Sequence, residues 1–284
     1  MISIIVCSVN NKLLNLLEKN INLTIGSDYE IIKINNSVLQ MGICEAYNYG
    51  FNVAKGAIIC FCHEDIVFEN INWGIELTSI LQNDETIGLV GVAGAIYKSL
   101  IPSPWMAIPS KHYRLNIQQK NNDGSIIKYT LNDCKLAEVA VLDGCFIAGR
   151  KAIFNQFPWN NDLLKKFHLY DLDISLRVGQ FYKLVITDSI SIIHLSEGNF
   201  DAIWLKESEL FHNHYKKKFP FNVGFIKKKE IQDIEYFTLL SHIYTLKRLK
   251  QPLKKICFYY FKLFLFNPFK ISNIFLLKYI IKTN

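Results

Sequence analysis

Short apolar runs alternate with amphipathic segments along the first third of the chain. Residues 2–9 form a β-branched apolar run that stops at two asparagines, which predicts a buried strand. Leucines and isoleucines then recur every three or four positions over 13–21, the spacing of a helix. The pattern continues with strands expected over 29–34, 57–62 and 88–95 and with helices over 43–54, closed by Lys55-Gly56, and over 75–81.

This alternation predicts an α/β fold in which helices flank a mainly parallel sheet. Ligands of such sheets bind beyond the carboxyl ends of the strands. Three of the expected strand ends carry polar side chains, at Ser8-Val9-Asn10, at Asn35-Asn36 and at His63-Glu64-Asp65. These positions are the first candidates for a ligand site.

The middle of the chain is less regular. Two short apolar segments, 113–119 and 126–131, flank residues 121–124 (Asn-Asn-Asp-Gly), which predicts a β-hairpin. Further elements are expected as a strand over 139–148, interrupted by Asp143-Gly144, a helix over 172–178, and a strand over 184–193 that ends at His194.

The segment His63-Glu64-Asp65 directly follows a buried strand. Carboxylates at such a place are costly unless they bind something, and a divalent cation that holds two phosphates is a natural partner. The alternative is an ordinary strand end that enters a polar loop. His194, at another strand end, is either a third ligand or a hydrogen-bonded histidine without a ligand.

A second acidic segment begins the helix expected over 172–178. Asp173 and Arg177 are four residues apart on this helix, so they are expected to form a side-chain pair with a structural role. Asp171 has no basic neighbour at helical spacing and is the candidate general base. The alternative is that Asp171 only stabilises the helix N-terminus.

Several common sites are disfavoured by spacing. Gly88, Gly91 and Gly94 give GxxGxxG inside an apolar run and not the GxGxxG of dinucleotide-binding folds. Neither a Walker loop nor a GxSxG elbow occurs. The seven cysteines include no CxxC pair, and Cys60, Cys62 and His63 are too close together for a usual zinc site. Buried, reduced thiols and an N-terminus without a basic leader predict a cytoplasmic protein.

The chain has 284 residues, 50% of them hydrophobic, which is enough for one good core and an extension. Its formal net charge of +7 comes from the last third, which is rich in lysine. A basic surface favours an anionic membrane or nucleic acid. The membrane is favoured because long apolar stretches accompany the lysines, and an aromatic platform for RNA is missing.

The C-terminal region contains two apolar segments, 256–266 and 271–281, which are separated by Asn267-Pro268 and interrupted by Lys262 and Lys278. A membrane-spanning helix needs about 20 apolar residues, and both segments are shorter. An amphipathic anchor at the inner face of the cell membrane is expected, with aromatics in the headgroup region and lysines on anionic lipid. The alternatives are a helical cap on the catalytic domain and a homodimer interface.

The residues above resemble a known family. Ile2 to Asn10, Ala46-Tyr47-Asn48 with Ala54-Lys55-Gly56, and Phe61 to Asp65 are similar, in order and spacing, to a family 2 glycosyltransferase of GT-A fold. Residues 170–177 (Tyr-Asp-Leu-Asp-Ile-Ser-Leu-Arg) resemble the family's Glu-Asp-x-Asp-Leu-Ser-Leu-Arg segment. The match is to a bacterial branch in which His-Glu-Asp replaces the usual DxD motif, and it covers roughly residues 1–210.

The resemblance implies a GT-A domain over 1–210, with an acceptor-side insertion at 97–140, followed by a basic, aromatic-rich helical extension over 211–284. It also implies an inverting transferase that moves a sugar from a nucleotide sugar, preferably a UDP-sugar, to a hydroxyl. The acceptor would be a saccharide, a lipid-linked saccharide or a glycoprotein, in cell-surface polysaccharide or glycan biosynthesis.

Site residues follow from the matching positions. The resemblance implies a Mn²⁺ or Mg²⁺ ion on Asp65 with His63 and His194, and Asp171 as the catalytic base. Trp105 and Tyr170 would lie on the acceptor side. The nucleotide-sugar positions are Ser8, Val9, Asn10, Asn35, Asn48, His63, Glu64, Asp143 and Gly144.

Two departures from the family pattern reduce the negative charge of the site. His63 stands in place of an aspartate, and the strand before Asn35 ends without a carboxylate. The rival hypotheses are therefore a catalytically silent sugar-nucleotide or glycan-binding protein and a membrane scaffold of a glycan-assembly complex. Only a transferase requires both Asp65 and Asp171.

Overall fold

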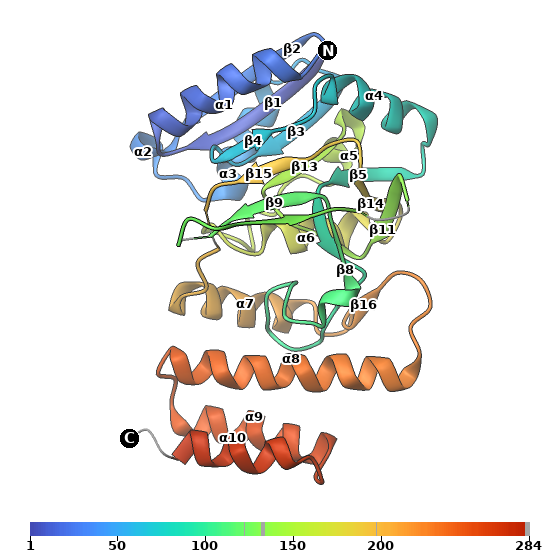
Figure 1. The fold of residues 1–284 in the computed structure, drawn as a ribbon. Coiled ribbons are helices and arrows are strands. Elements are labelled where there is room, and N and C mark those ends of the chain that lie inside the picture. Colours follow the sequence, from blue (N-terminus) through green and yellow to red (C-terminus); the bar gives the residue numbers. More distant parts are fainter. Residues whose placement is uncertain (122, 132–133, 197, 282–284) are drawn as a thin grey trace.

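A computed structural model describes residues 1–121, 123–131, 134–196 and 198–281. A seven-stranded sheet with the order β11-β14-β5-β13-β3-β1-β2 forms its centre (Figure 1). β13 and β11 run antiparallel to their neighbours, whereas β2, β1, β3, β5 and β14 share one direction, so the expected mainly parallel sheet is confirmed. The strands are β1 (Ile2–Ser8), β2 (Tyr29–Asn35), β3 (Ile58–Cys62), β5 (Ile87–Gly91), β11 (Leu136–Val139), β13 (Phe146–Arg150) and β14 (Lys183–Thr187).

The longer helices cover the sheet because they present an apolar stripe to it. α1 buries Leu14, Leu17 and Ile21, which recur at helical spacing, and β3, in the sheet interior, is buried along its whole length. The helices predicted near 13–21, 43–54, 75–81 and 172–178 are all present. The helices of this part are α1 (Asn11–Thr24), α2 (Asn36–Leu39), α3 (Ile43–Val53), α4 (Trp73–Asn83), α5 (Lys151–Gln156) and α6 (Tyr170–Val178).

Three segments expected as single strands, 88–95, 113–119 and 184–193, are instead each divided between different sheets. At the second of them the break is Asn116, which donates hydrogen bonds to the carbonyls of Thr187, Asp188 and Ile190 and leaves the ladder. Over 139–148 the expected interruption at Asp143-Gly144 is present, and the segment contributes to two sheets. The small sheets contain β4 (Ile66–Phe68), β6 (Ala93–Ala95), β7 (Tyr97–Lys98), β8 (Tyr113–Leu115), β9 (Ile117–Lys120), β10 (Ile126–Tyr129), β12 (Val141–Leu142), β15 (Ile192–His194) and β16 (Phe221–Asn222), with a short 3₁₀ turn, η1 (Ser110–His112), before β8.

The predicted hairpin corresponds to β9 and β10, which pair antiparallel. Asn122, which was expected in its turn, and Glu197 lie outside the described residues.

Four helices extend the molecule away from the sheet: α7 (Ala202–His214), α8 (Lys228–Arg248), α9 (Leu253–Phe266) and α10 (Ile271–Ile281), stacked in successive layers (Figure 1). Glu235 of α8 is buried and accepts hydrogen bonds from Tyr97, Ser99 and the Leu100 backbone N–H. Arg248, the last residue of α8, donates to the carbonyl of Phe200 at 2.6 Å. α8 is therefore attached to the domain in its first half and at its C-terminal end.

A second buried contact joins α7 to the same segment. Lys98 is 1% exposed, its Nζ lies 3.0 Å from His212 Nε2 of α7, and burial lowers the pKa of Lys98 to about 7. The expected division between residues 210 and 211 falls within α7, and it stays a prediction, as does the insertion at 97–140.

Candidate active site

The ends of β1 and β3 meet through Glu64. Its carboxylate accepts hydrogen bonds from the Ser8 hydroxyl and from the backbone N–H groups of Val9 (3.3 Å) and Asn10 (2.9 Å). Parallel strands place their carboxyl ends at one edge, so these residues, distant in sequence, become neighbours. Glu64 thus fixes the β1–α1 loop beside the loop that carries His63 and Asp65.

His63, Asp65 and His194 form a cluster whose potential ligand atoms all lie within 4.8 Å of one another. Strand register explains this, because His194 pairs with Ile66, the residue after Asp65, in the antiparallel β15–β4 pair. Asp65 Oδ1 lies 3.8 Å from His63 Nδ1 and 3.6 Å from His194 Nε2. One carboxylate oxygen therefore faces one nitrogen of each ring.

Hydrogen bonds assign the tautomer of His63. The Tyr170 hydroxyl lies 3.1 Å from the Gly144 carbonyl, which can only accept, and 2.7 Å from His63 Nε2. A hydroxyl has a single proton, so both contacts are satisfied together when Tyr170 donates to Gly144 and accepts from His63 Nε2–H, and we assign this tautomer. His63 Nδ1 is left without a proton and has its lone pair on the side of Asp65.

The same reasoning applies to His194. Gln119 Nε2 donates to the carbonyls of Lys120 (2.9 Å) and Ser196 (2.8 Å), so Gln119 Oε1 is the atom 3.2 Å from His194 Nδ1. That oxygen accepts the Nδ1 proton, so Nε2 is the nitrogen that a cation can bind once its own proton leaves. Without a cation, burial opposes the charged ring, but the Asp65 carboxylate outweighs it and raises the pKa of His194. Nε2 is buried and has no hydrogen-bond partner among the described residues, apart from its approach to Asp65.

The cluster fits a divalent cation. It combines two imidazole lone pairs with a carboxylate, and both rings are oriented by a second hydrogen bond, as metal-ligating histidines usually are. Burial favours the neutral form of Asp65, but interaction with His194 outweighs it and holds the pKa of Asp65 below its usual value. Asp65 is therefore an anion near neutral pH, as a metal ligand must be.

The cluster lies beside two cavities that share His63 and Phe167. The smaller, of about 190 Å³, is lined by Val9, Glu64 and Asp65 at the β1 end. The larger, of about 340 Å³, brings His194 together with predicted site residues from other parts of the chain, namely Trp105, Asp143, Gly144, Tyr170 and Asp171. A ligand that spans the cluster can occupy both cavities.

Two carboxylates line the larger cavity, and their surroundings differ. Asp143 accepts from Trp105 Nε1 and from the Cys145 N–H, both at 2.9 Å. Burial opposes its charge, but His194 and the hydrogen bond from Cys145 keep its pKa lowered. Burial, followed by repulsion from Asp143, raises the pKa of Asp171 to about 7. Asp171 is thus the carboxylate suited to take up a proton near neutral pH.

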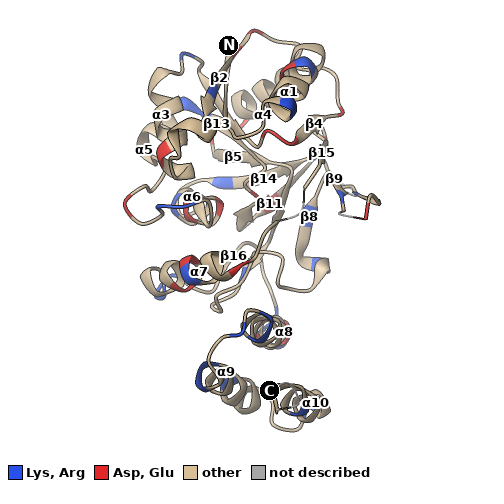
Figure 2. Ribbon diagram, turned by 90° about the vertical axis from the view of Figure 1, so that its left-hand side faces the viewer, with Lys and Arg blue, Asp and Glu red and all other residues tan. Residues whose placement is uncertain are grey.

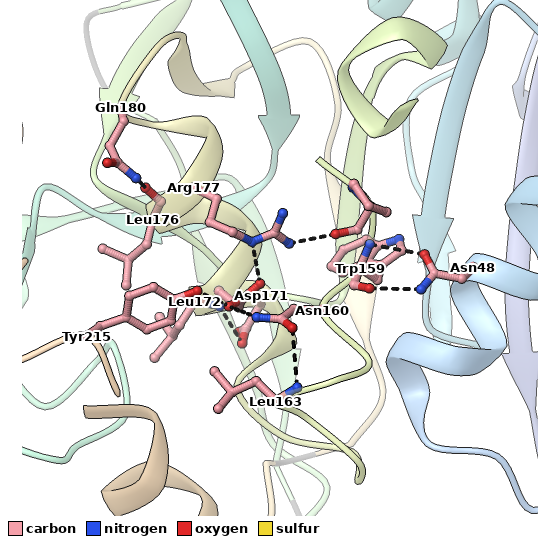
Figure 3. A network of polar contacts seen from close by, with 12 residues as sticks. Asn48, Trp159, Asn160, Leu163, Asp171, Leu172, Leu176, Arg177, Gln180 and Tyr215 are labelled. Carbon is pink, nitrogen blue, oxygen red and sulfur yellow. Dashed lines mark hydrogen bonds and ion pairs between the residues drawn. The ribbon is translucent and has the colours of Figure 1, made fainter. Parts of the chain in front are cut away.

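Asp173 forms the predicted pair with Arg177. Its Oδ2 lies 2.7 Å from Arg177 Nε, and its Oδ1 accepts from Asn160 (3.1 Å) and Tyr215 (2.7 Å). Arg177 also donates to the carbonyl of Pro158 and so lies between α6 and the loop that follows α5 (Figure 3). Asp173 is 1% exposed, which makes it a structural residue.

Three asparagines expected at the nucleotide form hydrogen bonds within the protein. Asn10 caps α1 by accepting from the Lys12 and Leu13 N–H groups, and Asn35 accepts from the Ser37 hydroxyl. Asn48 bonds the Trp159 carbonyl and N–H through both polar atoms of its amide (Figure 3). Neither Asn35 nor Asn48 lines the two cavities. Their assignment to the nucleotide remains a prediction.

Tyr170 and Gly144 interact closely. A Cβ added at Gly144 would lie 2.2 Å from the Tyr170 hydroxyl, so only glycine leaves room for it. The ring of Tyr170 packs against Tyr47 and Trp159, with centroids 5.8 and 5.6 Å away. The structure therefore adds a contact with His63 to the acceptor-side role expected of Tyr170.

Sequence reasoning missed Gln119, and it also missed Phe167, which lines both cavities. Phe167 lies three residues before α6, whose acidic first turn could have drawn attention to it. Gln119 carried no signal, because its importance arises from strand pairing with His194.

A model of the glycosyltransferase-like family matches residues 3–219. The chain belongs to the glycosyltransferase-like family. The matched range contains both cavities and every residue of the His63–Asp65–His194 cluster. The family expected from the strand ends and from the segment 170–177 is thereby confirmed. No curated protein matches the chain significantly.

Solved structures of glycosyltransferases share the fold of this family member. GalNAc-T7, crystallised with UDP, GalNAc and Mn²⁺, aligns with a TM-score of 0.50 and 13% identity, over 69% of this chain and 44% of its own. The mannosyltransferase PcManGT of Pyrobaculum calidifontis, in complex with GDP-Man and Mn²⁺, aligns with a TM-score of 0.50 and 11% identity, over 90% of this chain and 74% of its own. The expected GT-A fold is confirmed.

Proposed function

We propose that this protein is an inverting, metal-dependent glycosyltransferase that moves a sugar from a nucleotide sugar, preferably a UDP-sugar, to an acceptor hydroxyl. The observation that carries the proposal is the position of Asp171. Its carboxylate, with a pKa of about 7, lines the same cavity as His63 and His194 of the candidate metal cluster. A proton acceptor and a cation site therefore face one space.

The two cavities suggest how a donor is held. The diphosphate lies at the cluster, where His63 and Phe167 border both cavities. The nucleoside occupies the smaller cavity beside Val9, and the sugar projects into the larger one. GalNAc-T7 with UDP and PcManGT with GDP-Man, which share the fold, each bind a nucleotide or a nucleotide sugar together with Mn²⁺.

The reaction follows from these positions. Asp171 takes the proton of an acceptor hydroxyl, whose oxygen attacks the anomeric carbon as the bond to the diphosphate oxygen breaks. The leaving diphosphate keeps the bonding electron pair, and direct attack inverts the anomeric configuration. A bound divalent cation supplies charge compensation for the leaving group. With two imidazoles in the ligand set, Mn²⁺ is favoured over Mg²⁺, which prefers oxygen ligands.

The acceptor is a saccharide, a lipid-linked saccharide or a glycoprotein, in the biosynthesis of a cell-surface polysaccharide or another glycan. The larger cavity supports a sugar acceptor, because Trp105, Phe167, Phe200 and Trp204 offer it aromatic surfaces. Polar atoms of Gln119 and Asn199 accompany them at the wall. We place the reaction in the cytoplasm.

The test compares donor binding with transfer in Asp171→Asn. The variant retains an oxygen that can accept from the Leu172 N–H, as Asp171 does at 2.9 Å, so folding should persist. We expect unchanged thermal stabilisation by UDP-sugars with Mn²⁺ and a loss of transfer of about 10²–10⁴-fold. Asp233→Asn, an equal change at an exposed position of α8, serves as the matched control.

Asp65→Ala should abolish the Mn²⁺-dependent stabilisation by the donor. If the wild-type protein binds donors but releases no nucleotide with any acceptor or with water, the silent-binder hypothesis replaces this proposal. Transfer by Asp171→Asn at the wild-type rate would remove Asp171 from the reaction.

A further inference from the structure

The two C-terminal helices, α9 and α10, form the layer of the molecule farthest from the N-terminus (Figure 1). On α9, Ile256 and Leu263 are buried seven residues apart, and on α10 Leu276 and Ile280 are buried four apart. Each helix therefore turns one stripe towards the rest of the protein and leaves the opposite side free.

The free side is apolar and aromatic. At 100° per residue, Phe258, Phe261 and Leu265 lie opposite the buried stripe of α9, and they are 54, 60 and 62% exposed. Ile271 and Phe275 of α10 are 70 and 65% exposed in the same way. Phe269, between the helices, is 94% exposed. A cluster of large exposed apolar side chains usually marks an interaction surface.

Lysines lie on the same sides of both helices. Helical spacing places Lys254 among the exposed residues of α9 and Lys278 among those of α10. Lys262 Nζ lies 4.4 Å from the ring centroid of exposed Phe258. Positions 236–284 contain nine lysines and arginines and neither aspartate nor glutamate. All charged side chains of the two helices are therefore cationic (Figure 2). The occupant of this face must accept both apolar side chains and positive charge.

These requirements separate the candidate partners. A second copy of the chain would bring the same positive charge against itself. Nucleic acid offers phosphates but no apolar phase for the exposed phenylalanines. An anionic lipid bilayer offers both, because aromatic side chains enter the headgroup region while lysines contact lipid phosphates.

We propose that the face formed by Phe258, Phe261, Leu265, Phe269, Ile271 and Phe275, with Lys254, Lys262 and Lys278, docks on an anionic membrane surface. α9 and α10 lie in the plane of the membrane. Their 14 and 11 residues extend about 21 and 16 Å, shorter than a hydrocarbon core of about 30 Å. Throughout the described part of the chain, no helix combines the length and apolarity needed to span a bilayer.

The face is assembled before it meets lipid. Tyr236 of α8 donates to Asn273 Oδ1 at 2.7 Å, and Lys247 Nζ donates to the carbonyls of Tyr279 and Ile280, both at 2.6 Å. These contacts hold α10 on α8, so docking does not have to order the helices, which lowers the entropy cost of binding.

The first test is cosedimentation of the full chain with two kinds of vesicle. One contains phosphatidylcholine alone, and in the other phosphatidylglycerol replaces about a quarter of the lipid. We expect binding to the anionic vesicles that weakens as salt is raised, and little binding to the neutral ones. Lys262→Glu with Lys278→Glu should weaken binding by at least about 25-fold, since each lysine removed costs about fivefold. Equal binding to both vesicle types would overturn the proposal.

The matched control is Lys12→Glu with Lys19→Glu on α1, at the opposite end of the molecule (Figure 1). It makes the same change in net charge and should leave binding within about twofold. A comparable loss in the control would show that net charge, and not this face, binds the lipid. Thermal melts of both double variants verify folding, since all four positions are exposed.

A second measurement places the face in the bilayer. Phe269→Trp puts an indole at the most exposed position, while the four native tryptophans are at most 8% exposed. Brominated lipids should quench the fluorescence of this indole and leave the fluorescence of the native tryptophans unchanged. Absence of quenching would refute membrane docking. A dimer seen by sedimentation velocity without lipid, with the indole buried in it, would also refute membrane docking and would assign the face to a second copy of the chain.

Discussion

Gln119 Oε1 lies 3.2 Å from His194 Nδ1, on the side of the ring opposite Asp65. The two residues are direct neighbours in the parallel β15–β9 pair. Two backbone carbonyls fix the orientation of the Gln119 amide, so Gln119 determines which nitrogen of His194 is free to bind a cation. A hairpin residue thereby positions a candidate metal ligand.

Gln119→Leu should weaken Mn²⁺ binding about 10- to 100-fold, the usual effect of losing such an orienting partner. Gln118→Leu makes the same chemical change one residue earlier, where the side chain points to the opposite face of the strand and bonds Glu69. Titration with Mn²⁺, followed by electron paramagnetic resonance, measures the Mn²⁺ affinity of both variants in the absence of any sugar. Equal affinities in the two variants would show that Gln119 does not orient His194.

The transfer rate should depend on pH through Asp171. A general base must be ionised, and the pKa of Asp171 is about 7. At saturating Mn²⁺, kcat/KM is expected to fall about tenfold for each pH unit below 7 and to level off above it. A profile that is flat between pH 5.5 and 8 would contradict the assignment of the base.

The same carboxyl should affect stability in the absence of ligands. Its pKa is higher in the folded protein than in the unfolded chain, so the folded state binds the proton more tightly, and stability falls as pH rises from about 4 to 7. Asp171→Asn removes this loss. The free energy of unfolding of the variant, relative to that of wild type, should rise by about 1 kcal/mol per pH unit between pH 5 and 7. Above pH 7 the difference should stay constant. Urea denaturation at several pH values measures the difference, and a pH-independent difference would argue against it.

Asp173→Asn should act on stability and not on the chemical step. The substitution leaves Arg177 without its anionic partner and weakens a buried network that reaches Asn160 and Tyr215. We expect a loss of about 3 kcal/mol in the free energy of unfolding. Asp171→Asn, two residues earlier, provides the contrast, because it should not destabilise the protein. A loss below about 1 kcal/mol in Asp173→Asn would mean that the network carries little stability.

The meeting of the strand ends was predictable from sequence. Apolar runs that end in polar residues, in a chain where strands and helices alternate, place Ser8 and Glu64 at one sheet edge, and the structure joins them directly. The pair of Asp173 and Arg177 followed from helical spacing alone. Both predictions use local periodicity, which the sequence displays without reference to distant residues.

Other features depended on pairings that the sequence does not encode locally. Gln118 and Gln119 look alike in the sequence, and only the register of β9 against β15 distinguishes them. Asn10, Asn35 and Asn48 have side chains that suit either a ligand or a hydrogen bond within the protein, and the structure shows such a bond for each, to the backbone for Asn10 and Asn48 and to the Ser37 hydroxyl for Asn35. The long apolar segments were divided wrongly because a residue such as Asn116 leaves the ladder for reasons of tertiary contact.

Glu235 in the first half of α8 and Arg248 at its C-terminal end attach this helix to the domain, and Arg248 does so through Phe200, in the wall of the larger cavity. With α9 and α10 resting on a bilayer, such a rigid support sets a constant height between the lipid surface and Asp171. Acceptors would then be selected by how far their terminal sugar projects from the membrane, so a glycan one or two residues too short would fail to reach the base.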